Sequence, residues 1–324
     1  MKPDAPQQVP KIRLHRRAAI MKQPSHHNLR RRSASRGSTL VAIFLLACVL
    51  SARAARAQTI PFKRDGQLML VEASIDGSSP ALFIVDSGAS HTVFDPTFAK
   101  ELGLAVESAP PTTGTGAGPV TKSRTRAVVM SLHGLQVNLP EPWVIDLSKA
   151  PFPRTVRGLV GAELFKNHVV QIDPVRSTLT FFDPASYQYK GEGKAIPLLV
   201  EGDKLFLEAA LEVPAGRVVT HKLRIDTGSE SSVNDEIVRE SAEVRTSILG
   251  GGLGEDFKSY SGVFASVKLG PFTIKHVWGP GGPNPAIGLE LLRRFVLTFD
   301  APHGHLYLEP TPALADLVPT PPSN

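Results

Sequence analysis

The chain has 324 residues and a single cysteine, Cys48, which lies in a basic N-terminal stretch. From residue 58 onward there is no cysteine at all. This part of the chain therefore has no disulfide, no thiol nucleophile and no thiolate ligand for a metal ion. Its stability must come from its hydrophobic core, for which residues 58–324 are long enough.

Long apolar runs are also scarce. The run at residues 40–50 is about 11 residues long, whereas a membrane-spanning helix needs roughly 20. Arginines precede it (Arg30, Arg31, Arg32 and Arg36), and the small-residue pattern Ala55-Arg56-Ala57 follows it. This order is typical of a secretory signal. We expect residues 1–57 to be cleaved and the protein to be exported, periplasmic or secreted, with no membrane attachment afterwards.

Other interpretations of this segment stay open. The run Arg30 to Arg32 weakly suggests twin-arginine export, and Leu45 to Cys48 weakly resembles a lipoprotein cleavage site. The long polar stretch before Met21 suggests Met21 as an alternative start.

Positive charge is confined to the same segment. Residues 1–57 hold 12 of the 36 Lys and Arg residues and one of the 30 acidic residues, Asp4. The remainder has 24 basic and 29 acidic residues, a net charge of about −5. Phosphate binding needs basic surface on the folded part, so the sequence predicts no nucleic-acid partner.

Glycine and proline are abundant instead, with 27 and 28 residues, many between short apolar runs. This pattern favours short strands and turns over long helices. Residues Leu68–Ile75 and Ala81–Val85 predict a hairpin around Asp76-Gly77. Further predicted elements are strands at 127–132 and 135–139 and short helices at 96–104, 163–167 and 289–294.

The chain repeats itself. The segment 81–90, containing Asp86-Ser87-Gly88, is matched 140 residues later by 221–230, containing Asp226-Thr227-Gly228. Downstream, the segment around Gly161 is matched 127 residues later by the one around Gly288, and the strand that follows each is matched as well, at 169–173 and at 295–300. Each copy closes with a strand, at 178–182 and at 305–308. Four matched features in one order indicate an internal duplication.

The duplication predicts a mostly all-β fold with a few short helices, built from two homologous lobes related by pseudo-two-fold symmetry. We expect an N-terminal lobe at 58–184, a connection at 185–202, a C-terminal lobe at 203–309 and a Pro-rich, loose tail at 310–324.

A two-fold axis brings equivalent positions together, so Asp86 and Asp226 are expected to face each other. Two close carboxylates cannot both ionise easily, and the pair shares a proton. The ionised member acts as a general base on water, and the protonated member polarises a carbonyl. These two residues are the predicted catalytic pair, with no metal and no cofactor; His303 and His305 are expected to be solvated.

Neighbouring residues have predicted supporting roles. Gly88 and Gly228 are expected to let the chain turn sharply, through a positive φ, and to donate backbone N–H groups to the carboxylates. Ser87 and Thr227 are expected to form hydrogen bonds across the lobe interface. If the Ser229 hydroxyl donates to Asp226, the Asp226 anion is favoured and Asp86 holds the shared proton.

On these residues the chain resembles the pepsin-like and retropepsin-like aspartic peptidases, and it is most similar to exported two-lobed bacterial members. The resemblance covers roughly residues 62–310 and implies structural glycines behind the pair, Gly161 and Gly288. It also implies mobile flaps over a cleft, which we place at two Gly-rich segments. The flap residues are Gly114, Thr115, Gly116, Gly252 and Gly254.

The implied activity is aspartic endopeptidase activity of a monomer on peptide or protein substrates. Three departures stand out: Arg224 replaces an apolar residue, Glu230 places a third carboxylate near the pair, and the first flap has no tyrosine. Arg224 and Glu230 motivate an alternative, a non-catalytic peptide-binding or scaffolding protein. A glycoside hydrolase is a further alternative, with Trp143 and Trp278 as sugar platforms, although aromatics make up only 6% of the chain.

Overall fold

The computed structural model describes residues 57–114, 118–249, 253–254 and 257–316. The chain divides into two compact units, 1–53 and 54–324, and the second contains all of the described residues. The predicted signal therefore lies outside the described residues except for Ala57, and so does Cys48. None of the helices in the described ranges is both long and apolar enough to cross a bilayer.

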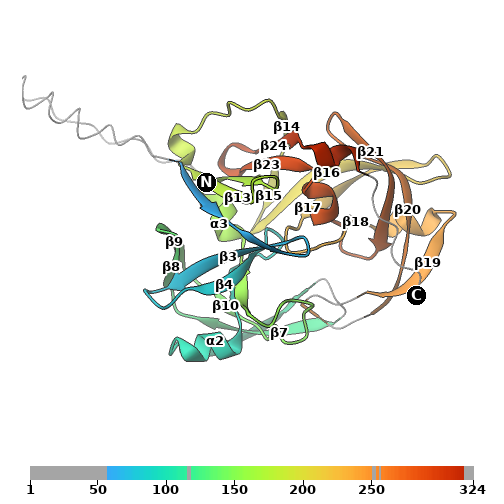
Figure 1. Ribbon diagram of the computed structural model, residues 1–324. Helices are drawn as coiled ribbons and strands as arrows, with labels where there is room; N and C mark the ends of the chain where they lie inside the picture. Colours follow the sequence, from blue (N-terminus) through green and yellow to red (C-terminus); the bar gives the residue numbers. More distant parts are fainter. Residues whose placement is uncertain (1–56, 115–117, 250–252, 255–256, 317–324) are drawn as a thin grey trace, which may run out of the picture. The chain divides into compact units, whose positions relative to one another are not determined.

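The first half of the described chain forms a ten-stranded sheet, drawn in blue to green in Figure 1. Its strand order is β6 (Val106–Thr113), β7 (Pro119–Thr125), β10 (Trp143–Val144), β5 (Val93–Phe94), β11 (Val156–Val160), β4 (Ala81–Val85), β3 (Leu68–Ile75), β8 (Val128–Leu132) and β9 (Leu135–Leu139), with β2 (Lys63–Asp65) paired to β3.

The second half forms an eight-stranded sheet within the described ranges, drawn in yellow to red. Its order is β18 (Val233–Asn234), β22 (Ala286–Ile287), β17 (Val218–Ile225), β16 (Lys204–Glu212), β20 (Phe257–Leu269) and β19 (Val244–Leu249), with β15 (Leu199–Glu201) on β16 and β21 (Phe272–Gly281) on β20.

A third sheet joins the two halves. Its six strands, in the part of the chain that is described, follow the order β1 (Gln58–Pro61), β13 (Thr178–Phe182), β12 (Val169–Asp173), β23 (Phe295–Asp300), β24 (His305–Pro310) and β14 (Lys194–Pro197). At its centre β12 and β23, which are equivalent strands of the two sequence copies, pair antiparallel with Val170 opposite Phe299. A local two-fold axis requires this antiparallel pairing of equivalent strands.

Turn chemistry explains the hairpins. Asp76 and Gly77 have φ values of 47° and 81° and connect β3 to β4, as predicted. The Asp76 carboxylate accepts a hydrogen bond of 2.8 Å from the Val129 N–H and so ties this turn to β8. His133 and Gly134, at φ 49° and 97°, connect β8 to β9 in the same way. Aspartate, histidine and glycine tolerate this left-handed region better than other residues.

Helices in the described chain are short. They are α2 (Pro96–Glu101), α3 (Ala162–Asn167) and α4 (Leu289–Leu292), with 3-10 turns η1 (Pro184–Ser186), η2 (Glu236–Glu240), η3 (Ala301–His303) and η4 (Pro312–Ala315). Asp95 caps α2 by accepting from the Thr97 N–H at 2.9 Å, and proline follows it at the first helical position. The predicted mostly β fold with a few short helices is confirmed.

The segment expected to be a loose tail is bound to the body as far as Asp316. Arg294 is fully buried, and its guanidinium donates to the Ala313 and Asp316 carbonyls as well as to Glu290. Thr311 in turn donates to the Arg294 carbonyl at 3.0 Å. A buried guanidinium needs acceptors, and this segment supplies two of them.

A chain ending at Pro310 is therefore expected to be less stable than one ending at Asp316. The shorter chain leaves Arg294 without two carbonyl acceptors, which costs on the order of 2 kcal/mol or more. Thermal unfolding should show a melting temperature lower by roughly 5 °C. Equal melting temperatures would show that Arg294 does not depend on residues 311–316.

Candidate active site

Asp86 and Asp226 occupy equivalent places at the ends of two strands. β4, which leads to Asp86, pairs parallel with β11, and β17, which leads to Asp226, pairs parallel with β22. The Asp86 N–H donates to the Val160 carbonyl at 2.9 Å, and the Asp226 N–H donates to the Ile287 carbonyl at 3.0 Å. The same local structure is thus built twice, and each copy presents one carboxylate.

Ser87 and Thr227 lock the two copies together. The Thr227 hydroxyl accepts from the Ser87 N–H at 2.9 Å and donates to the Val85 carbonyl at 2.8 Å. The Ser87 hydroxyl accepts from the Thr227 N–H at 3.1 Å and donates to the Ile225 carbonyl at 2.8 Å. Both side chains are fully buried. Each hydroxyl thus accepts from one backbone group and donates to another in the opposite half. These hydrogen bonds fix the two aspartates relative to each other.

Gly88 and Gly228 lie against the carboxylate of the opposite half. A β-carbon on Gly88 would lie 2.7 Å from Asp226 Oδ1, and one on Gly228 would lie 2.6 Å from both Asp86 oxygens. Neither glycine has a positive φ, so the expectation of a sharp left-handed turn was wrong. The reason for glycine here is the close approach of the two chain segments. The expected donation is present, since each N–H reaches its own aspartate, at 2.8 and 3.1 Å.

The two carboxyl groups are both buried but differ in the charged groups that contact them. Asp86 and Asp226 are only 8% and 5% exposed. Burial, reinforced by the Asp226 charge, raises the pKa of Asp86 to about 7, against the opposing effects of Arg224 and of the Gly88 and Ala89 N–H groups. Arg224 Nη2 donates to Asp226 Oδ2 at 2.9 Å, and its side chain is 13% exposed. Among the described residues, this guanidinium makes its ion pair with Asp226 and not with Asp86.

Ser229 does not donate to Asp226. Its hydroxyl lies 2.8 Å from the Ser231 hydroxyl. The side chain that donates to Asp226 is instead Arg224. In the sequence, Arg224 was recognised only as a departure from an apolar pattern. One signal in the sequence pointed to it, a charged residue where the matched position of the first copy has Ile84.

Gly161 and Gly288 lie behind the loops that follow the aspartates. A β-carbon on Gly161 would lie 2.6 Å from the His91 carbonyl oxygen, and one on Gly288 would lie 2.8 Å from the Ser229 carbonyl oxygen. Glu163, at the start of α3, supports the first of these loops because its carboxylate accepts from the Thr92 N–H at 3.0 Å. Glu163 was missed by sequence reasoning, although Glu290 repeats it two residues after Gly288.

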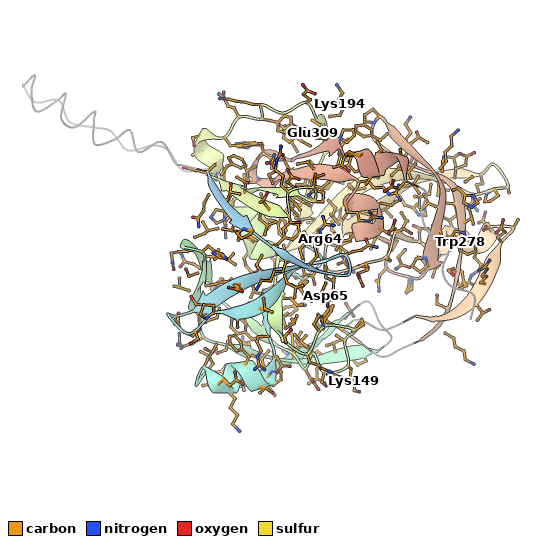
Figure 2. The ribbon with its side chains drawn as sticks, viewed as in Figure 1. Arg64, Asp65, Lys149, Lys194, Trp278 and Glu309 are labelled. Carbon is orange, nitrogen blue, oxygen red and sulfur yellow. The ribbon has the colours of Figure 1, made fainter. Side chains whose placement is uncertain are left out.

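The two carboxylates open into a cleft with a volume of about 300 Å³ that both halves line. Glu230 lines it, but its Oε1 accepts from the Gln67 N–H at 2.6 Å. Gln67 lies in the turn of the β2–β3 hairpin, on which Figure 2 labels Arg64 and Asp65. The third carboxylate is thus bound to this hairpin.

The predicted flap residues fall beside the β6–β7 and β19–β20 hairpins. Thr115, Gly116 and Gly252 lie outside the described residues. Gly114 lines the cleft, and its α-carbon lies close against the Leu253 backbone carbonyl, so the described parts of the two segments meet there. Gly254 is described but does not line the cleft.

Only one of the two tryptophans lines the cleft. Trp143 lines it and stacks on His91 with ring centroids 4.2 Å apart. Trp278 lies on β21, away from the cleft lining, with the Arg245 guanidinium 4.8 Å from its ring centroid (Figure 2). His303 and His305 are both exposed, as expected, and His303 Nδ1 lies 2.6 Å from Asp300 Oδ1. Within the described residues, no group of three or more His, Cys, Asp or Glu side chains is arranged to hold a metal ion.

The mostly β architecture is consistent with an all-β aspartic peptidase fold. Residues 71–164 match the model of a protein family described as aspartyl protease. The matched region runs from β3 into α3 and includes Asp86, Ser87, Gly88 and Gly161. The match supports an aspartic peptidase family and, with it, a protease or hydrolase. A comparison with curated proteins finds no significant match.

Proposed function

We propose that the protein is an aspartic endopeptidase and that Asp86 and Asp226 are its catalytic pair. The observation that supports this most strongly is the packing of each carboxylate against the glycine of the opposite half. Both acids are buried, and both line the same cleft. Ser87, Gly88, Thr227 and Gly228 hold the pair in place through backbone and hydroxyl hydrogen bonds.

The environments of the two acids suggest their roles. Asp226, in contact with Arg224, takes a proton from a bound water as general base. Asp86, with a pKa raised to about 7, is the protonated member and donates to the carbonyl oxygen of the substrate. The hydroxide adds to the carbonyl carbon. The tetrahedral intermediate then collapses when the leaving nitrogen receives the proton from Asp226 and the C–N bond breaks. One hydroxyl of the intermediate returns its proton to Asp86 in this step, so that a carboxylic acid and an amine leave and the pair regains its starting protonation.

The setting of this activity is also a proposal. The basic, apolar and small-residue order of residues 1–57 supports export to the periplasm or outside the cell, where the protein acts as a monomer on peptides or proteins. We place the flaps at the β6–β7 and β19–β20 hairpins, because Gly114 and Leu253 both line the cleft.

The test is cleavage of a mixed peptide library by residues 58–324 from pH 3 to pH 9. We expect cleavage that is lost in the double variant Asp86→Asn, Asp226→Asn. Because Asp86 must hold its proton and its pKa is about 7, kcat/KM should fall about tenfold per pH unit above pH 7. A folded wild-type protein that cleaves nothing would exclude the peptidase, and a flat profile to pH 9 would exclude Asp86 as the acid.

One observation favours a second candidate, a peptide-binding protein without turnover. Arg224 occupies Asp226 Oδ2, an oxygen that a catalytic water needs to approach. In that case wild-type protein binds library peptides in the cleft, and isothermal titration detects this binding with no product formed.

A further inference from the structure

The two halves of the cleft differ at positions that the duplication makes equivalent. In the first half, Ile84 and Phe94 are fully buried in the core. The positions 140 residues later hold Arg224 and Asn234, and both line the cleft. Apolar residues have thus been exchanged for polar ones on one side of the catalytic pair only.

The first-half wall contains a cluster of apolar side chains. Val93, Trp143, Ile145 and Phe152 line it, and His91 stacks against Trp143. The Lys122 ammonium lies 3.4 Å from the centroid of the Trp143 ring. The ring has polar groups against its faces and remains half-buried at the cleft. This wall fits an apolar or aromatic side chain.

The second-half wall holds two cations, Lys204 and Arg224. Lys204, the first residue of β16, lines the cleft and makes no ion pair within the described chain. Arg224 bonds to Asp226 through Nη2, and its buried Nε has no partner among the described residues. The acid on this side, Glu230, is held by the Gln67 N–H. Arg224 is thus paired with Asp226 and Glu230 is held by a backbone N–H, whereas Lys204 is a cation at the cleft without an ion-pair partner in the described chain.

We infer that the cleft selects substrates with an apolar or aromatic side chain on one side of the scissile bond and an acidic side chain on the other, with the carboxylate bound by Lys204 beside Arg224. This inference rests on the proposed peptidase activity and specifies its substrate class. A guanidinium has five N–H donors and an ammonium three, so both cations retain donors for a carboxylate beyond the contacts they make within the protein.

The test uses matched peptides that carry an aromatic residue on one side of the cleaved bond and Glu, Gln or Lys on the other. Wild type should cleave the Glu peptide at least tenfold better than the Lys peptide, as kcat/KM. Lys204→Glu should reduce this ratio at least tenfold or invert it. The control is Lys194→Glu on β14 (Figure 2), a lysine of the joining sheet outside the cleft lining, which should keep the wild-type ratio.

A second readout separates this inference from the activity. Binding of the same peptides to the Asp86→Asn variant, measured by isothermal titration, should show tighter binding of the Glu peptide whether or not turnover occurs. Equal cleavage of Glu and Lys peptides by wild type would overturn the inference and leave the peptidase standing. Absence of cleavage together with a Glu preference in binding would overturn the proposed peptidase activity and support the inferred preference for an acidic side chain. Equal Kd values for all three peptides would overturn the inference in either case.

Discussion

Asp86→Asn is expected to lower peptide cleavage by roughly a thousandfold and, at pH 8, to raise the melting temperature above that of wild type. The loss of activity follows because an amide supplies no proton to the substrate carbonyl, and general acid–base catalysis contributes about 10²–10⁴-fold per group. The gain in stability follows because two buried acids no longer repel each other.

The sign of the stability effect comes from linkage. Burial and the Asp226 charge raise the pKa of Asp86 from 3.8 to about 7. Between about pH 4 and pH 7 the native state holds a proton that the unfolded state has lost, so wild-type stability falls as pH rises through this window. Asparagine has no such proton. The melting temperature of Asp86→Asn relative to wild type should therefore rise from pH 4 to pH 8, by several degrees.

Asp226→Asn provides the matched comparison. It should be equally inactive, because the general base is lost. Its stability should differ, since Arg224 loses the carboxylate that it contacts at 2.9 Å and a nearly buried guanidinium is left with a neutral partner. At pH 8 its melting temperature should lie below that of Asp86→Asn. Substantial cleavage by either single variant would falsify the catalytic pair.

The duplication made much of this site predictable. A repeated Asp-Ser/Thr-Gly after an apolar strand, followed by a repeated glycine before a short helix, predicts both the strand ends and their juxtaposition across a two-fold axis. Residues such as Ser87 and Thr227 could be anticipated because backbone groups at such a crossing need polar partners.

The parts of the site that could not be predicted from the sequence depend on which side chains contact each other. The spacing of residues in the sequence does not determine these contacts. Arg224 and Ser229 are both near Asp226 in the sequence, yet only Arg224 contacts its carboxylate. Gly88 suggested a turn because glycine serves turns more often than close contacts, whereas here its φ is ordinary and the opposite carboxylate fills the space. The Pro-rich end was expected to be loose because the buried charge of Arg294, which binds it, is not visible in the sequence.

Gly228→Ala is expected to reduce kcat/KM at least a hundredfold. Its φ is not in the left-handed region, so alanine meets no backbone penalty there. The obstacle is the Asp86 carboxylate, whose two oxygens would each lie 2.6 Å from the new methyl group. Asp86 has to move, and a displacement of about 1 Å in a catalytic group costs on the order of 10²-fold. Steady-state kinetics on the library-derived substrate measures the effect.

The reason for the loss can be separated from a general cost of replacing glycine. Gly216→Ala, in the β16–β17 turn, has a φ of 82° with no atom within 4 Å of the added carbon. It should lose roughly 1 kcal/mol of stability and keep its kcat/KM. In an Asp86→Ala background, Gly228→Ala should cost less stability than in wild type, because the atoms it meets are gone. An equal cost in both backgrounds would mean that the contact between Gly228 and Asp86 is not what requires glycine, and the close approach of the two halves would then lose its main support.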